Sequence, residues 1–111
     1  MANAYKILGQ ANLTTTSDTD IYTVPASTET VVSTIIVANI GTVATTFNLA
    51  LREDGDTLAN KHYIAKAVPI AASDSTTLTL GITLDAADVV TAAAGTANAL
   101  SFNIFGTEIT A

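Results

Sequence analysis

Residues 75–84, STTLTLGITL, alternate strictly between apolar and small polar side chains. A period of two places the two sets of side chains on opposite faces of a β-strand, with one face buried. The stretches TTFNLALRE (45–53) and ALSFNIFG (99–106) show the same pattern. Phe47 and Phe102 fall on the apolar rows of these stretches, so we expect both rings in the core of an all-β domain.

The run TVVSTIIVANI (30–40) departs from this pattern, because apolar side chains occupy both of its faces. Two interpretations fit such a run. One is a strand that is covered on both sides, with the second cover supplied by another subunit. The other is a β-bulge that changes the facing of the chain midway. The sequence leaves both interpretations open.

Turn residues separate the apolar runs at intervals of roughly ten residues, which is typical of a sandwich or barrel. Four of these turns are marked by Pro25, Gly41, Asp54-Gly55 and Pro69. The chain has 111 residues, which is the length of one ordinary domain. We therefore predict a single-domain antiparallel β-sandwich, either a jelly roll or an immunoglobulin-like fold.

The alanine-rich stretch and the N-terminal residues do not show the clear alternation of the other strands. The alanine-rich stretch 84–100 is compatible with a helix by composition, but its β-branched residues and its glycine lower the helix propensity. We predict a strand around DVVTA (88–92) instead. Residues 1–20 are predicted to form an N-terminal strand and an extended arm, and residues 21–111 the sandwich itself.

The composition limits the classes of partner. The formal net charge is −6, and 13% of the residues are charged, against about 25% in a typical soluble domain. Binding to nucleic acid needs a cationic stripe that displaces counterions from phosphates, and an anionic membrane attracts basic segments. The basic residues are few and scattered, so we expect neither partner: Lys6, Arg52, Lys61 and Lys66.

The lack of cysteine limits the chemistry of the chain without fixing its compartment, and the lack of targeting segments bears on the compartment. There is no cysteine, which removes disulfides, thiolate nucleophiles and cysteine-ligated zinc together. The N-terminal MANAYKILGQ has no apolar run typical of a signal peptide, and no stretch approaches the ~20 apolar residues of a membrane span. We expect the protein to assemble in a host cytoplasm.

We expect no catalytic, cofactor-binding or metal site. His62 is the sole histidine, and no serine lies in a G-x-S-x-G setting. His62 itself is predicted to lie in a strand, with its imidazole at the surface or at an interface. The acidic segment 53–56 is interpreted as a tight turn, because Asp and Gly tolerate positive φ. Whether this loop also binds a cation is left open.

A small glycan-binding protein is one alternative, because sugar sites are often built on β-sandwiches. Such sites use aromatic platforms, whereas this chain has no tryptophan and its three tyrosines are scattered. Phe105 faces the opposite way from Phe102 in the alternating pattern, so we predict that Phe105 is an interface residue.

Six motifs carry a resemblance that extends over nearly the whole chain: KILGQ (6–10), DIYTVPAST (20–28), VVSTIIVANIGT (31–42), ATTFNLAL (44–51), VPIAASDSTTLTLGITLDAADVV (68–90) and LSFNIFGTEI (100–109). In this order they resemble a family of small virion structural proteins of tailed bacteriophages. The resemblance implies a component of the particle, without separating head from tail. The segment REDGDTLANKHY (52–63) departs from the family and is expected to be the solvent-facing tip of a hairpin.

The resemblance, the low charge and the Thr/Ala-rich faces predict a capsid decoration (cement) protein that binds and stabilises the assembled head shell on the outer surface of the virion. The predicted partners are the major capsid protein and copies of the chain itself, as a homotrimer. The alternative is a tail or fibre component with an adhesion or receptor-facing role. The N-terminal arm and the C-terminal strand supply the candidate intersubunit contacts, which are Tyr5, Ile7, Leu8, Phe105 and Ile109.

Overall fold

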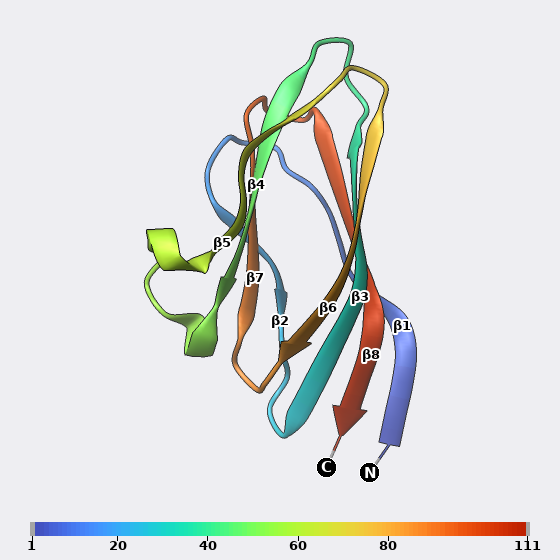
Figure 1. Cartoon of the computed structure of the whole chain (residues 1–111), viewed down its shortest axis with the longest axis vertical. Helices are drawn as coiled ribbons and strands as arrows, with labels where there is room; N and C mark the ends of the chain where they lie inside the picture. The colour runs from blue at the N-terminus through green and yellow to red at the C-terminus, as the bar shows by residue number, and fades with distance from the viewer. Residues whose placement is uncertain (1, 111) are drawn as a thin grey trace.

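The computed structural model describes residues 2–110, which form two antiparallel four-stranded sheets (Figure 1). Sheet A contains, in spatial order, β1 (Ala2–Asn12), β8 (Leu100–Thr110), β3 (Thr28–Asn39) and β6 (Ser75–Leu84). Sheet B contains β2 (Thr19–Thr23), β7 (Val89–Ala94), β4 (Thr45–Arg52) and β5 (Tyr63–Ile70). Two short 3-10 turns, η1 (Glu53–Gly55) and η2 (Asn60–His62), lie between β4 and β5.

The strand pairing is that of a jelly roll. β1 pairs with β8, β2 with β7, β3 with β6 and β4 with β5, all antiparallel. The chain is thus one long hairpin rolled over two sheets, and the pairs β3·β8 and β4·β7 join its halves. An immunoglobulin-like sandwich groups its strands differently. The prediction of a single-domain antiparallel sandwich is confirmed, and the strand order selects the jelly roll.

The core lies between the two sheets. The rings of Phe47 in β4 and Phe102 in β8 meet edge to face, with 6.5 Å between their centroids. Both rings are buried, as the alternating pattern predicts. Such aromatic pairs contribute about 0.5–1.5 kcal/mol beyond the burial of their area. The largest aliphatic side chains that complete this core are Val32, Ile35, Val37, Leu49, Val90, Leu100 and Ile104.

A β-bulge accounts for the apolar residues on both faces of β3. The pairing of β3 with its two neighbours shifts between Val32 and Thr34. Val32 and Ile35 therefore both point into the core, although they are three residues apart. Val31 and Ile36 point outwards and are only partly covered. The bulge interpretation is confirmed, and the outward apolar residues become part of the surface described below.

The first twenty residues are part of the sandwich. β1 pairs with β8 along its whole length, from Ala2 to Asn12, and β2 already begins at Thr19. The loop between them is anchored by the buried Leu13, whose N–H donates to the carbonyl oxygen of Leu100 at 3.3 Å. The boundary predicted after residue 20 therefore falls inside strand β2. The predicted N-terminal strand is β1, which forms an edge of sheet A and is not a separate arm.

The connection between β4 and β5 is longer than the predicted tight turn. Asp54 and Gly55 do adopt positive φ, 54° and 68°, but η1 and η2 extend the link. His62, predicted to lie in a strand with its imidazole at the surface or at an interface, lies in η2 and is only 7% exposed, so the predicted strand and the surface position are wrong. Its Nδ1 accepts a hydrogen bond from the N–H of Ala59 at 2.9 Å, which holds the ring inward.

Two further local predictions concern the strands of sheet B. The strand predicted around 88–92 is confirmed as β7, all six residues of which are buried. Pro69, expected between two strands, lies inside β5. The sheet accommodates it because β5 is an edge strand, where a residue without an N–H need not break a ladder bond.

Candidate interaction surface

The outer face of sheet A is almost free of charge. Within the described strands, Glu29 is the single charged residue that the cross-strand register places on this face. Amides and hydroxyls are less costly to cover than ions are, so the face suits burial under a partner. Its residues are Asn3, Tyr5, Ile7, Gln10 and Asn12 in β1; Ser101, Asn103, Phe105, Thr107 and Ile109 in β8; Glu29, Val31, Thr34, Ile36 and Ala38 in β3; and Ser75, Thr77, Thr79 and Thr83 in β6.

An apolar strip crosses the half of this face where β1 begins and β8 ends. Tyr5 and Ile7 are 80% and 51% exposed, and Val31 is 36% exposed. The register sets Ile7 beside Phe105 in the neighbouring strand. Ile109 lies two strand steps beyond Thr107, in line with the outward residues of β8. We define the apolar strip by these members: Tyr5, Ile7, Val31, Phe105 and Ile109.

Four of the five predicted contact residues thus lie on one face. Leu8 does not share it, because the pairing of β1 with β8 shifts between Ile7 and Gly9. This irregularity turns Leu8 against the core, where it is partly buried. Val31 was missed in the sequence, since its outward direction depends on the bulge in β3. No residue near this bulge is of a type that marks bulges, so the sequence does not show where the bulge lies or that Val31 points outwards.

The other half of the face, toward the β7–β8 link, is polar but neutral. Gln10 Nε2 donates to Asn103 Oδ1 at 2.7 Å, and Asn12 Nδ2 donates to the carbonyl oxygen of Leu100 at 2.9 Å. These amides line a shallow depression of about 330 Å³ with Ser101. This half of the face therefore offers hydrogen-bonding groups next to the apolar strip and carries no ion itself, and Glu29 lies at the other end, beside Ile109.

The centre of the corresponding face of sheet B, along β7, is covered by the chain itself. Val89, Thr91 and Ala93 of β7 lie on that face, yet each is at most 5% exposed. Gly55 of η1 lies against Val89, so the segment between β4 and β5 supplies part of this cover. The molecule thus covers the centre of the outer face of sheet B, whereas the central strands of sheet A stay partly exposed on their outer face.

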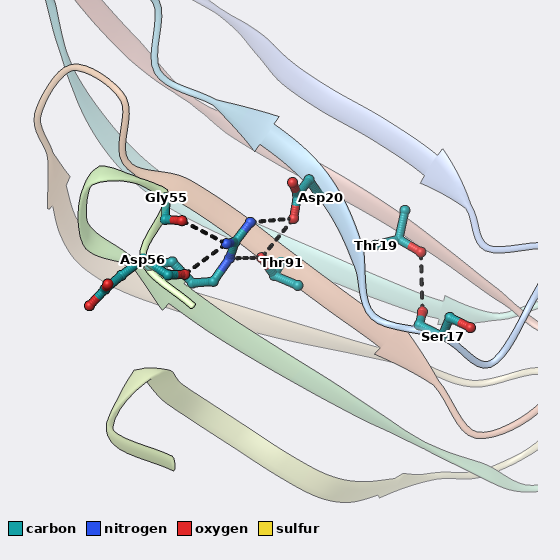
Figure 2. A network of polar contacts seen from close by, with 7 residues as sticks. Ser17, Thr19, Asp20, Gly55, Asp56 and Thr91 are labelled. Carbon is teal, nitrogen blue, oxygen red and sulfur yellow. Dashed lines mark hydrogen bonds and ion pairs between the residues drawn. The ribbon is translucent and has the colours of Figure 1, made fainter. Parts of the chain in front are cut away.

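A single guanidinium holds this cover in place (Figure 2). Arg52 donates to the carbonyl oxygens of Gly55 and Asp56 at 3.0 and 2.8 Å. It also donates to Thr91 Oγ1 at 3.0 Å and to Asp20 Oδ1 at 2.7 Å. Because the planar fork bonds two strands and the turn at once, it fixes the position of η1 over β7.

A hydrogen-bonded network lies on the inner side of the apolar strip. Glu108 accepts from Lys6 Nζ at 2.7 Å and from the Tyr22 hydroxyl at 2.6 Å. Tyr22 is also 2.8 Å from Thr30 Oγ1. The bonds from Lys6 and Tyr22 lower the pKa of Glu108. Burial, together with the bond to Glu108, raises the pKa of Tyr22 to about 12. The network fixes the four strands beneath the strip.

The end of the sandwich that carries the β6–β7 link is acidic. A depression of about 410 Å³ there is lined by Glu29, Glu53, Asp85 and Asp88, with no basic residue among its lining side chains. Asp88 is already engaged, because its two oxygens accept from the backbone N–H groups of Asp54 and Asp85 at 2.9 and 2.8 Å. Within residues 2–110, no three acidic, histidine or cysteine side chains are grouped closely enough to hold a metal ion.

The opposite end carries two exposed apolar side chains in the β3–β4 link, Ile40 and Val43, which are 63% and 68% exposed. They were missed in the sequence, where Ile40 was assigned to the strand that ends at Asn39. Gly41, which directly follows, was the available signal that the strand had ended. This tip is a second surface that a partner could cover.

The sole histidine, His62, is engaged in the connection between β4 and β5. His62 Nε2 lies 3.9 Å from Asp56 Oδ2, and the imidazole is otherwise occupied by the Ala59 N–H, so it organises the β4–β5 connection. Over residues 2–110, no helix has the length and apolar character needed to cross a membrane. No protein-family model matches the chain, and no curated protein is significantly similar to it.

Proposed function

We propose that this chain is a structural protein of a tailed-phage virion, and specifically a decoration protein that binds the assembled head shell through the outer face of sheet A. One observation carries the proposal: the central strands of this face are uncovered and nearly uncharged, while the chain covers the central strand β7 on the outer face of sheet B with its own residues. Jelly rolls occur in capsid and lectin domains alike, and a fold alone does not specify a function. The sequence resemblance supports the choice of a virion.

A decoration protein would stabilise the shell through the thermodynamic coupling between its binding and shell assembly. A protein that binds the assembled shell and not its free subunits stabilises the shell by mass action. Burial of a large apolar side chain contributes about 1.5–3 kcal/mol, so the apolar strip supplies a modest contact at each copy. The same contact is repeated at every copy on the symmetric shell. If neighbouring copies of the chain are linked to one another, these weak contacts add up to persistent attachment.

The docking face is tested by binding purified protein to head shells that lack it. Val31→Lys places a charge in the apolar strip on a central strand, away from the sheet edges. We expect the affinity for shells to fall about tenfold or more, because the ammonium group of the lysine would have to lose its water in the contact. Ile64→Lys, at a 44% exposed isoleucine of β5, is the matched control and should bind as the wild type does.

A third variant, Val43→Lys, separates the two exposed apolar surfaces. If Val43→Lys abolishes binding and Val31→Lys does not, the tip and not sheet A is the docking surface. Binding of all three variants with wild-type affinity would contradict an apolar contact at either surface.

Head and tail are separated by the copy number of the chain in purified virions, measured by quantitative mass spectrometry against the major capsid protein. A ratio near one to one supports a shell-wide decoration protein. A few copies per particle would instead assign the chain to the tail or fibre. Absence from particles would contradict the proposal altogether.

A further inference from the structure

The edges of the two sheets differ in how they are protected. In sheet B, the edge strand β2 has only five residues, and the edge strand β5 carries Lys66, Pro69 and a residue of positive φ, Ala67. Short strands, prolines, irregularities and lysines are the devices by which proteins prevent pairing at an open edge. Sheet B is therefore closed to further strands.

The edges of sheet A are longer and carry fewer of these devices: β1 has one lysine, Lys6, and a bulge at Leu8, and β6 has one irregularity in its pairing with β3. β1 has 11 residues and β6 has 10, and neither strand contains a proline. Residues 2–7 of β1 are exposed on both faces. A strand edge of this length presents a row of backbone N–H and C=O groups that fits another strand.

The directions of the strands allow the two open edges to pair with each other. Successive strands of sheet A are antiparallel, so β1 and β6 run in opposite directions in one molecule. When two copies stand side by side in the same orientation, β1 of one lies antiparallel to β6 of the next. The sheet then continues across the contact without a change in its pattern.

The charges favour this pairing over the two symmetric ones. β1 contains one basic residue, Lys6, and no acidic residue, whereas β6 is uncharged and flanked by Asp74 and Asp85. Pairing β6 with β6 of a second copy would bring acidic residues together at both ends of the contact. Pairing β1 with β1 would bring two lysines to one edge and leave both β6 edges open. Pairing β1 with β6 joins a basic edge to an acid-flanked one.

We infer that copies of this chain associate head to tail, with β1 of one molecule added to the β6 edge of sheet A in the next. Such a contact is heterologous, so it closes into a ring of three or more copies or extends into a filament. The outer face of sheet A stays uncovered in this arrangement. The inference does not depend on shell binding, since it concerns the protein alone in solution.

The chain lacks cysteine, so single cysteines report the contact cleanly. Asn3→Cys places a thiol on β1 and Thr83→Cys places one on β6, both at exposed positions. Thr79→Cys is a second β6 position that allows for a different register, and Val43→Cys at the tip is the control for random collisions. Each variant is treated with a short bis-maleimide, alone and after co-expression with a partner variant, and folding is checked by circular dichroism.

Crosslinked dimers are expected when Asn3→Cys is co-expressed with a β6 variant, and in neither variant alone. Native mass spectrometry of the unaltered chain should show species of three or more copies. Dimers from Asn3→Cys alone would mean that β1 pairs with itself and would overturn the inference. The same holds for a strictly monomeric chain, for no crosslinking in any mixture, or for Val43→Cys crosslinking equally well.

Discussion

At the scale of single residues, Glu108 is the most consequential ionisable group. Its carboxylate accepts from Lys6 and Tyr22, and these bonds favour the charged form, so its pKa lies below the ordinary value of 4.5. A carboxylate with a lowered pKa stabilises the fold above its unfolded pKa, and this contribution is lost as the pH falls through its folded pKa. Tyr22 makes the stability of the fold depend on pH in the alkaline range instead. Its contribution is complete below pH 10 and is lost as the pH rises toward about 12.

Glu108→Gln is expected to lower the free energy of unfolding by about 1–2 kcal/mol at pH 7, because two charge-assisted hydrogen bonds are weakened. The variant should also lose less stability than the wild type when the pH is lowered below 4.5, since the titrating group is gone. Urea denaturation at several pH values measures both effects. Glu29→Gln, at an exposed carboxylate of the same sheet, is the control. Equal acid sensitivity of wild type and Glu108→Gln would contradict the assignment.

The hydrogen bonds of Arg52 lead to a second prediction about a single residue. Arg52→Lys keeps the charge but cannot reproduce the fork that bonds Asp20, Thr91 and the turn carbonyls, so we expect a loss of about 1–2 kcal/mol. Hydrogen exchange should quicken in residues 53–62 before it changes elsewhere. Lys61→Gln removes an exposed ion pair to Asp56 of 3.7 Å and should cost less than about 0.5 kcal/mol. Unchanged exchange in Arg52→Lys would show that the turn is held by other contacts.

At the scale of the elements, two glycines in sheet A have opposite roles. Gly106 in β8 lies where a Cβ would collide with the carbonyl oxygen of Val31 and meet Leu8 Cδ1 at 3.0 Å. Strand β8 is held on both sides by β1 and β3, so its backbone cannot move away. Gly81 in the edge strand β6 has nothing within 4 Å of a Cβ position.

Gly106→Ala is therefore expected to destabilise the protein by about 3 kcal/mol, as overpacking against a fixed backbone does. Gly81→Ala should be neutral or stabilise by up to about 1 kcal/mol, because alanine restricts the unfolded chain more than glycine does. Thermal and chemical denaturation of the two variants side by side give the comparison. Similar effects at both positions would mean that β8 is less tightly held than its pairing implies.

At the scale of the whole molecule, the sandwich is complete as a single copy. A monomer of 11.3 kDa is expected to expose about 5,700 Å², and this chain exposes 5742 Å². No partner is required to close its core. Contacts through the outer face of sheet A or the open edges are therefore additions to a finished fold, and variants at those places should alter association while leaving folding intact.

The two chain ends lie side by side (Figure 1), because Ala2 pairs with Thr110 across the β1·β8 ladder. A circular permutant that joins the ends through a short Gly/Ser linker and opens after Thr57 should fold to the same structure. The opening lies in an exposed part of the β4–β5 connection, where few backbone bonds are at risk. Circular dichroism and denaturation measure the outcome. A permutant that fails to fold would show that order at this connection is needed early in folding.

The sequence by itself determined the elements and the inward face of most of them. The two-residue period identified the strands around Phe47 and Phe102, and the positive φ at Gly55 followed from its residue type, because these properties depend on neighbours in the chain. Four of the residues proposed as contacts could be found in the same way, since an apolar side chain on the outward row of a strand is visible in the pattern.

The tertiary structure alone decided which strands are neighbours, and with that the properties of the surface. The burial of His62, the inward turn of Leu8 and the outward position of Val31 each depend on a bulge or a turn set by non-local contacts. The partly exposed outer face of sheet A, the covered centre of the outer face of sheet B and the open edges at β1 and β6 follow from the jelly-roll strand order. Periodicity specifies the two faces of each strand, but pairing between distant segments determines what lies against each face and edge.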